Sequence, residues 1–180
     1  VSLRDQVLRS LGDFLQDGME AAFAEHRARA SELWAIAGTR IPDDPRAERG
    51  LRYNTFELLA CYSGHDPDVS IGAKALGGEG YRGQVFWDTE AYLLPFYIFT
   101  NPAAARSLLM YRYNRLPAAR ENARKNGLNG AQFPWNSADT GEEDSTEEYV
   151  KTVRGDMEVW HPENMLHPNG TIAYGVEQYV

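Results

Sequence analysis

GEGYRGQVFWDTEAYLLPF, residues 78–96, changes character at its middle. Glycine and aromatic residues fill its first half, a composition that is typical of a loop. From Thr89 the apolar residues recur at helical spacing, which predicts a helix as far as Phe99. Trp87 and Asp88 are therefore expected at the point where a loop enters a helix, with a large ring and a carboxylate side by side.

The Trp87-Asp88 pair has two interpretations. A pyranose sugar offers an apolar C–H face that can stack on a tryptophan ring, and hydroxyl groups that can donate to a carboxylate. The alternative is structural, with Trp87 in the core and Asp88 as the helix cap. A second loop, QFPWNSADTGEED at residues 132–144, places Trp135 among polar residues. Two such loops favour a cleft that binds carbohydrate.

The rest of the chain is also predicted to be helical, so the expected fold class is all-α. Strand patterns are nearly absent. Long loops are expected over residues 64–88 and 128–146, at the same end of the helices, and residues 41–50 are interpreted as a shorter loop. A short helix is predicted over residues 145–155. The other expected helices cover residues 2–15, 19–37, 51–63, 89–99, 103–116, 117–126 and 171–180.

Composition narrows the class of partner. The chain of 180 residues has 18 Lys and Arg against 26 Asp and Glu, a formal net charge of −8. This acidic balance provides no basic stripe for nucleic acid or anionic lipid. No apolar run reaches the roughly 20 residues that span a bilayer. The single cysteine, Cys61, lies in an apolar stretch and indicates a small buried side chain in a reducing, cytoplasmic compartment.

No metal site and no nucleotide cofactor are expected. His161, Glu163 and His167 are irregularly spaced and interrupted by prolines, so they lack the i, i+4 pattern of a helical zinc site. The chain has no P-loop and no G-x-S-x-G elbow, and its glycine-rich GGEG follows no predicted strand. A small neutral molecule is the expected ligand.

Three blocks carry a resemblance to a known family: GEGYRG-VFWDTE at residues 78–90, ARSLLMYRYN at 105–114 with the following FPW-SA--GEE, and LRYNTFELL at 51–59. The chain resembles the inverting disaccharide phosphorylases of the maltose, kojibiose and trehalose type, glycoside hydrolase family 65. The resemblance implies a partial (α/α)6 barrel over residues 41–180, preceded by linker helices over residues 1–40. It also implies an excerpt of a longer protein, whose full-length form is expected to be a homodimer.

The resemblance also implies roles for individual residues. Trp87 and Asp88 match the family's Trp-Asp pair, which holds the nonreducing glucose in the donor subsite. Glu90 and Trp135 are expected around the acceptor sugar. The remaining implied residues are Gln84 and His167, which would also bind substrate, and Arg52 and Asn54, which would support the residues that touch it.

The family's reaction is an inverting hexosyl transfer. A carboxylic acid protonates the leaving oxygen while inorganic phosphate attacks from the opposite face, which gives β-glucose 1-phosphate. Phosphate is thus a co-substrate and no cofactor is needed. The family's general-acid glutamate and phosphate loop match no residue here, so no catalytic residue is assigned and the isolated chain is expected to be inactive.

Departures from the family's motifs keep two alternatives open. Gln84 stands where the phosphorylases usually have His, Asn136 replaces a Glu, and Met165 and Thr171 replace acidic residues. Linkage and acceptor specificity are therefore open. The alternatives are an inverting α-glucoside hydrolase on the same scaffold and a noncatalytic helical domain that binds carbohydrate.

A partial barrel would also leave apolar side chains without the later helices that cover them. Such exposure favours association, so the chain alone is expected to aggregate or to unfold without a sharp transition. The side chains expected to be exposed in this way are Leu93, Leu94, Phe96, Leu108 and Leu109.

Overall fold

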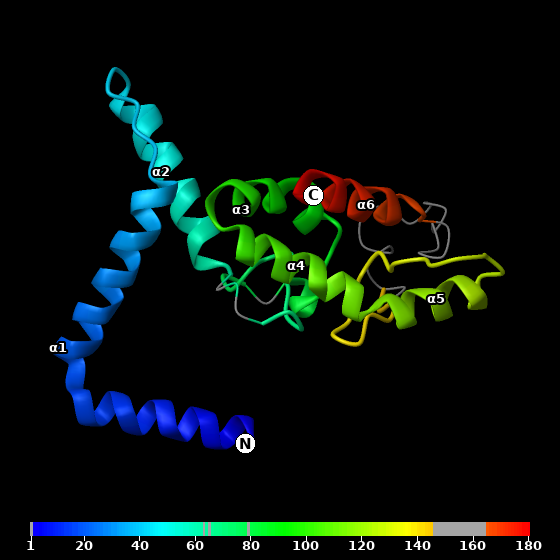
Figure 1. The fold of residues 1–180 in the computed structure, drawn as a ribbon, viewed down its shortest axis with the longest axis horizontal. Coiled ribbons are helices and arrows are strands. Elements are labelled where there is room, and N and C mark those ends of the chain that lie inside the picture. The colour runs from blue at the N-terminus through cyan, green and yellow to red at the C-terminus, as the bar shows by residue number, and fades with distance from the viewer. Residues whose placement is uncertain (1, 63, 65, 79, 146–164) are drawn as a thin grey trace, which may run out of the picture. The chain divides into compact units, whose positions relative to one another are not determined.

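The computed structural model describes residues 2–62, 64, 66–78, 80–145 and 165–180 (Figure 1). Two compact units, Val1–Thr55 and Phe56–Val180, divide the chain. Within the described residues every regular element is a helix, and pairing between extended segments is limited to two isolated β-bridges. The all-α prediction is therefore confirmed for this part of the chain. The predicted helix over residues 145–155 lies almost wholly outside it.

The first unit contains α1, Leu3–Ala37, and most of α2, Pro45–Ala60. Ser2 is the N-cap of α1, and its hydroxyl accepts from the Asp5 backbone N–H at 3.2 Å. Gly18 interrupts α1 with a φ of 81° and a ψ of 171°. Because a left-handed φ is cheap only for glycine, this break divides α1 into the two helical segments that were predicted.

The prediction of a loop over residues 41–50 is wrong in its second half, because α2 begins at Pro45. The Asp44 carboxylate accepts from the backbone N–H groups of Arg46 and Ala47 at 3.1 and 2.9 Å. An aspartate cap followed by proline in the first helical position is a strong helix start. Proline is also typical of loops, but Pro45 in this position initiates the helix.

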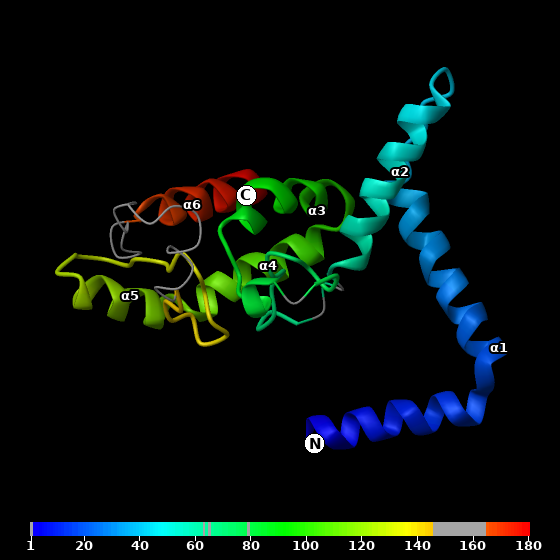
Figure 2. The same cartoon turned by 180° about the vertical axis from the view of Figure 1, so that it is seen from behind.

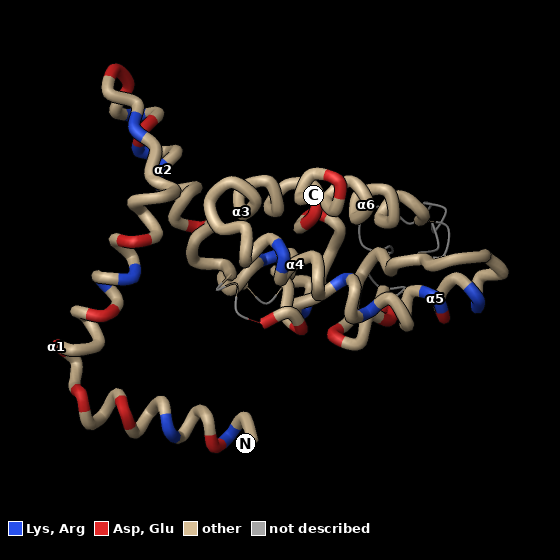
Figure 3. Tube along the Cα trace, in the orientation of Figure 1, with Lys and Arg blue, Asp and Glu red and all other residues tan. Residues whose placement is uncertain are grey.

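The second unit is built around α3, α4 and α6, which pack against one another (Figures 1 and 2). A π-helical turn, η2, precedes α3, and a short turn of 3₁₀-helix, η1, lies in the preceding loop. Acidic and basic residues are interspersed along α1, α2 and α5 (Figure 3). The elements are η1 Gly80–Gly83, η2 Thr89–Leu93, α3 Leu94–Thr100, α4 Pro102–Asn114, α5 Leu116–Lys125 and α6 His167–Tyr179.

The core of this unit contradicts the predicted exposure of Leu94 and Leu108, which are both 0% exposed. Contacts among α3, α4 and α6 cover them, and α6 lies far away in the sequence. Leu93, Phe96 and Leu109 are partly buried against the same core. The large apolar side chains that are exposed here belong to other positions, among them Tyr92, Phe99 and Tyr174.

Gly175 allows α6 to approach the core closely. A Cβ atom at this position would lie 2.9 Å from Leu94 Cδ2 and 3.4 Å from Glu90 Cβ. We expect Gly175→Ala to lower the free energy of unfolding by about 1–3 kcal/mol, because overpacking forces the core apart. The matched control is Gly170→Ala on the same helix, where the new Cβ would meet nothing within 4 Å. Equal melting temperatures of the two variants would contradict the prediction.

Candidate functional site

The two long loops of the second unit, which were predicted at the same end of the helices, contact each other. Val85 and Ser137 exchange both backbone hydrogen bonds, at 3.1 and 2.9 Å, and form an isolated antiparallel bridge. The Asp144 N–H donates to the Asn136 carbonyl at 3.0 Å and extends the contact within the second loop. The bridge lies two residues before Trp87 and two residues after Trp135 in their loops, so it brings the two tryptophans together.

Trp87, Trp135 and His167 form an aromatic cluster. The ring centroids lie 6.2 Å apart for Trp87–Trp135, 5.2 Å for Trp87–His167 and 5.3 Å for Trp135–His167. The three rings come from two loops and the first residue of α6. Both tryptophans are half-buried and His167 is exposed. The structure thus assembles three of the predicted substrate-binding residues from segments that are distant in the sequence.

Asp88 does not act as a helix cap. It precedes η2, but its backbone is already helical, with φ −56° and ψ −32°, and its side chain makes no capping hydrogen bond. A capping residue has extended dihedral angles and accepts from an N–H of the first turn. The structural interpretation of Asp88 is therefore wrong. Its exposed carboxylate lies beside Trp87 in the sequence and has no hydrogen-bond partner among the described residues.

Glu90 is buried among the helices of the second unit, and its predicted place around the acceptor sugar stays a prediction. It is 1% exposed and forms a forked ion pair with Arg112 of α4, which is 3% exposed. The two bonds are 2.8 Å from Arg112 Nε to Glu90 Oε1 and 2.9 Å from Nη2 to Oε2. Burial lowers the pKa of Arg112, but the charge and hydrogen bonds of Glu90 outweigh this effect and hold the pKa above its ordinary value.

Gln84, which directly precedes Val85 of the bridge, also connects the two loops. Its Nε2 donates to the Asp144 carbonyl at 3.1 Å and also to the Asp144 carboxylate. Its Oε1 is buried without a hydrogen-bond partner among the described residues. The amide therefore joins the two loops, and the predicted role of Gln84 in substrate binding stays a prediction.

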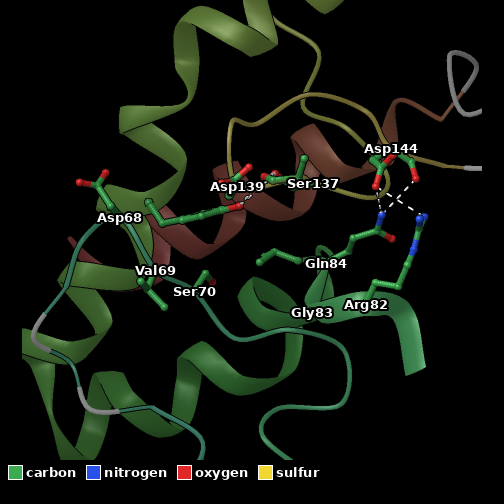
Figure 4. A pocket seen from close by; sticks show the side chains of 12 residues that line it. Asp68, Val69, Ser70, Arg82, Gly83, Gln84, Ser137, Asp139 and Asp144 are labelled. Carbon is green, nitrogen blue, oxygen red and sulfur yellow. Dashed lines mark hydrogen bonds and ion pairs between the residues drawn. The ribbon is translucent and has the colours of Figure 1, made fainter. Parts of the chain in front are cut away.

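A pocket of about 410 Å³ lies beside Gln84 and the bridge (Figure 4). Residues 68–70, 82–85 and 137–139, with Tyr111 and Asp144, line it. Figure 4 shows Gln84, Arg82 and Asp144 converging at one side of the pocket, with Asp68 opposite. Trp87, Asp88 and Trp135 are not part of its lining. The pocket and the aromatic cluster are thus separate features.

Glu143 is a residue of the site that sequence reasoning missed. Its carboxylate accepts from the Trp135 N–H at 2.6 Å, the Asn136 N–H at 3.1 Å and the Ser145 N–H at 3.1 Å. A carboxylate that accepts several backbone donors fixes a loop. In the sequence, Glu143 lies in a run of acidic residues, which is typical of a solvated surface. The signal that could have identified it is that these backbone N–H groups lie outside the helices and need another acceptor.

Arg52 and Asn54 belong to the first unit. The Arg52 guanidinium lies 4.9 Å from the centroid of the Trp34 ring in a cation–π contact, and Asn54 is exposed. Their predicted support of the substrate-binding residues stays a prediction. Of the three residues considered for a metal, only His167 is described, and the described residues contain no group of three or more His, Cys, Asp or Glu that could hold one.

Comparisons with known proteins identify a matching family and similar relatives. The model of the glycosyl hydrolase family 65 central catalytic domain matches residues 52–180. The chain is 44% identical over 177 residues to the kojibiose phosphorylase of Thermoanaerobacter brockii, an alignment that covers 98% of the chain and 23% of that protein. It is 39% identical over 171 residues to the maltose phosphorylase of Bacillus subtilis (strain 168), with 94% and 21% covered.

A solved structure shares the fold. It is described as "Putative kojibiose phosphorylase from human microbiome" and has a TM-score of 0.82 and 30% sequence identity to this chain. The match covers 98% of this chain and 22% of that structure. In addition, no helix among the described residues is both long enough and apolar enough to cross a membrane.

The chain therefore belongs to glycosyl hydrolase family 65, because the family's central catalytic domain accounts for more than half of it. This confirms the resemblance found in the sequence. The chain spans about a fifth of the length of the relatives it matches, 23% for the Thermoanaerobacter brockii kojibiose phosphorylase and 21% for the Bacillus subtilis maltose phosphorylase.

Proposed function

We propose that this chain is part of an inverting disaccharide phosphorylase, which transfers glucose from an α-linked disaccharide to inorganic phosphate and releases β-glucose 1-phosphate. Its place in family 65 and its identity to kojibiose and maltose phosphorylases support this function. The single observation that carries the proposal is the Trp87-Asp88 pair, in which an unpaired carboxylate follows a ring of the aromatic cluster.

The geometry suits a hexose. A sugar ring can place its C–H face on the half-buried Trp87 ring and donate its hydroxyl groups to the Asp88 carboxylate. The buried Trp87 Nε1 has no acceptor among the described residues, so the indole N–H can donate to a sugar oxygen after a small movement of the ring. Trp135 and His167 lie beside this ring and provide the surface for a second sugar.

The proposal assigns a binding role to four residues and assigns no general acid. Asp88 and Trp87 hold the donor glucose, and Trp135 and His167 contact the acceptor. Phosphate is a co-substrate, and the groups that bind it are not assigned to this chain. Residues 41–180 form the first part of an (α/α)6 barrel, and residues 1–40 form the linker helices that precede it. The full-length protein is proposed to be a cytoplasmic homodimer.

The proposal is tested by phosphate dependence. The protein that carries this chain is incubated with kojibiose, maltose or trehalose, with and without inorganic phosphate, and the products are followed by ¹H NMR. The expected result is β-glucose 1-phosphate that forms only with phosphate. Release of free glucose at the same rate without phosphate would identify the inverting hydrolase instead. Binding of disaccharide without turnover would identify a noncatalytic carbohydrate-binding domain.

A further inference from the structure

The buried Glu90–Arg112 pair has a third partner. Arg112 Nη2 also donates to the backbone carbonyl of Phe86 at 3.0 Å, and Phe86 directly precedes Trp87. One guanidinium therefore connects α4, the carboxylate of η2 and the backbone that leads into the Trp87-Asp88 pair. All of these bonds lie in an environment from which water is nearly excluded, since Glu90 is 1% and Arg112 3% exposed.

The direction of the Asp88 carboxylate depends on this backbone. No hydrogen bond to another described residue holds the side chain, and its dihedral angles are helical. The Trp87 carbonyl accepts from the N–H groups of Glu90 and Ala91, each at 3.1 Å. Because nothing holds the carboxylate itself, the path of the chain from Phe86 to Glu90 decides where it points.

The turn that carries this path is π-helical and is held from two sides. Single π-helical turns occur frequently at functional sites. The Thr89 hydroxyl donates to the Ile71 carbonyl at 3.1 Å, and Glu90, the next residue, bonds to Arg112. Thr89 and Glu90 are both buried, with 2% and 1% exposed. The chain is thus fixed at the two residues that directly follow the exposed Asp88.

We propose that Glu90 and Arg112 are positioning residues of the sugar site, which fix the Phe86 carbonyl and thereby the directions of the Trp87 ring and the Asp88 carboxylate. This inference rests on the function proposed above. A guanidinium is required, because the group must bond two carboxylate oxygens and one carbonyl in a fixed plane, whereas lysine offers a compact ammonium without a planar fork.

The test compares two lysine substitutions, one on α4 and one at the residue directly after α4, in the protein that carries this chain. Arg112→Lys keeps the charge but loses the fork. The control is Arg115→Lys, because Arg115 also connects α4 to loops, through Asp68 at 3.3 Å and the Asp139 carbonyl at 2.7 Å, but does not touch Phe86. Affinity for kojibiose and maltose is measured by calorimetry well below the melting temperature of each variant, and kcat and KM are measured with phosphate.

Arg112→Lys is expected to lower disaccharide affinity and kcat/KM by about tenfold to a hundredfold, because a small misplacement of a binding group has effects of this size. Arg115→Lys is expected to lower the melting temperature and leave both quantities unchanged. An Arg112→Lys variant that melts earlier but binds as the wild type would overturn the inference. So would an equal loss of affinity in both variants.

A second variant covers the case in which Arg112→Lys does not fold. Glu90→Gln keeps the shape of the side chain but removes the charge that holds the Arg112 guanidinium beside Phe86, and the disaccharide affinity of this variant is expected to fall in the same direction. If neither variant folds, the pair determines folding and the inference is overturned. Trp87→Ala and Asp88→Asn separate the two proposals. If they bind as the wild type, the proposed sugar site at this pair fails, whereas if only they lose affinity, the positioning role alone fails.

Discussion

Arg112→Met should lower the free energy of unfolding by about 3–5 kcal/mol, because it leaves the Glu90 carboxylate buried without a partner. Methionine fills a similar volume, so the loss reports the uncompensated charge rather than a cavity. The Phe86 carbonyl loses its bond to the guanidinium in the same variant. Urea unfolding of the protein that carries this chain, followed by circular dichroism, measures the effect against the wild type.

The double variant Glu90→Leu with Arg112→Met is the decisive control. Removing both charged partners avoids the unpaired carboxylate, and buried ion pairs replaced by apolar residues are often neutral in stability. We therefore expect the double variant to recover most of the loss. The exposed pair of Glu121 and Arg124 on α5 provides a second control. Arg124→Met should leave the unfolding curve unchanged, because solvent screens surface ion pairs. A double variant as unstable as Arg112→Met would contradict the prediction.

Much of the helical architecture could be predicted from periodicity and from helix start signals. The predicted helices over residues 103–116 and 117–126 match α4 and α5 closely, since Pro102 and Pro117 lie in their first turns. The start of α2 was missed because Asp44-Pro45 contains both a loop signal and a cap signal. Only the backbone bonds of the Asp44 carboxylate distinguish them.

The burial of Leu94 could not be predicted, because it depends on a distant contact. Its neighbour across the interface is Gly175 of α6, and nothing in the local sequence of either residue shows that the two meet. The same holds for the bridge between Val85 and Ser137, which joins two loops. Periodicity shows which face of a helix is apolar, but it does not identify the element that covers the face.

The location of Glu90 follows from geometry that the sequence contains. Residues two positions apart on a helical turn do not share a face. Asp88 and Glu90 therefore point in different directions, and an exposed Asp88 places Glu90 toward the interior. The identity of its partner is not encoded locally, because Arg112 is one of several arginines between residues 105 and 124. Only the tertiary fold, which brings Glu90 of η2 within reach of Arg112 of α4, selects it.

Asp88→Asn should lower kcat/KM for phosphorolysis by about tenfold to a hundredfold, because losing a hydrogen bond to a charged group costs roughly 1.5–3 kcal/mol. An amide accepts on one side only, whereas the carboxylate can accept from two sugar hydroxyl groups. The melting temperature should stay near that of the wild type, since the carboxylate makes no capping bond. Phosphate-dependent release of β-glucose 1-phosphate, measured beside a melting curve, checks both parts.

Trp87→Ala should cost at least as much activity as Asp88→Asn, because it removes the stacking surface for the sugar as well as the contacts of this ring with Trp135 and His167. The melting temperature should fall in this variant, so its kinetics must be measured well below it. Trp87→Phe keeps an aromatic face and should retain more activity than Trp87→Ala. If Trp87→Ala melts earlier but turns over like the wild type, the ring is a core residue. If Asp88→Asn also keeps wild-type kinetics, neither side chain binds the donor glucose, and the sugar site lies elsewhere in the protein.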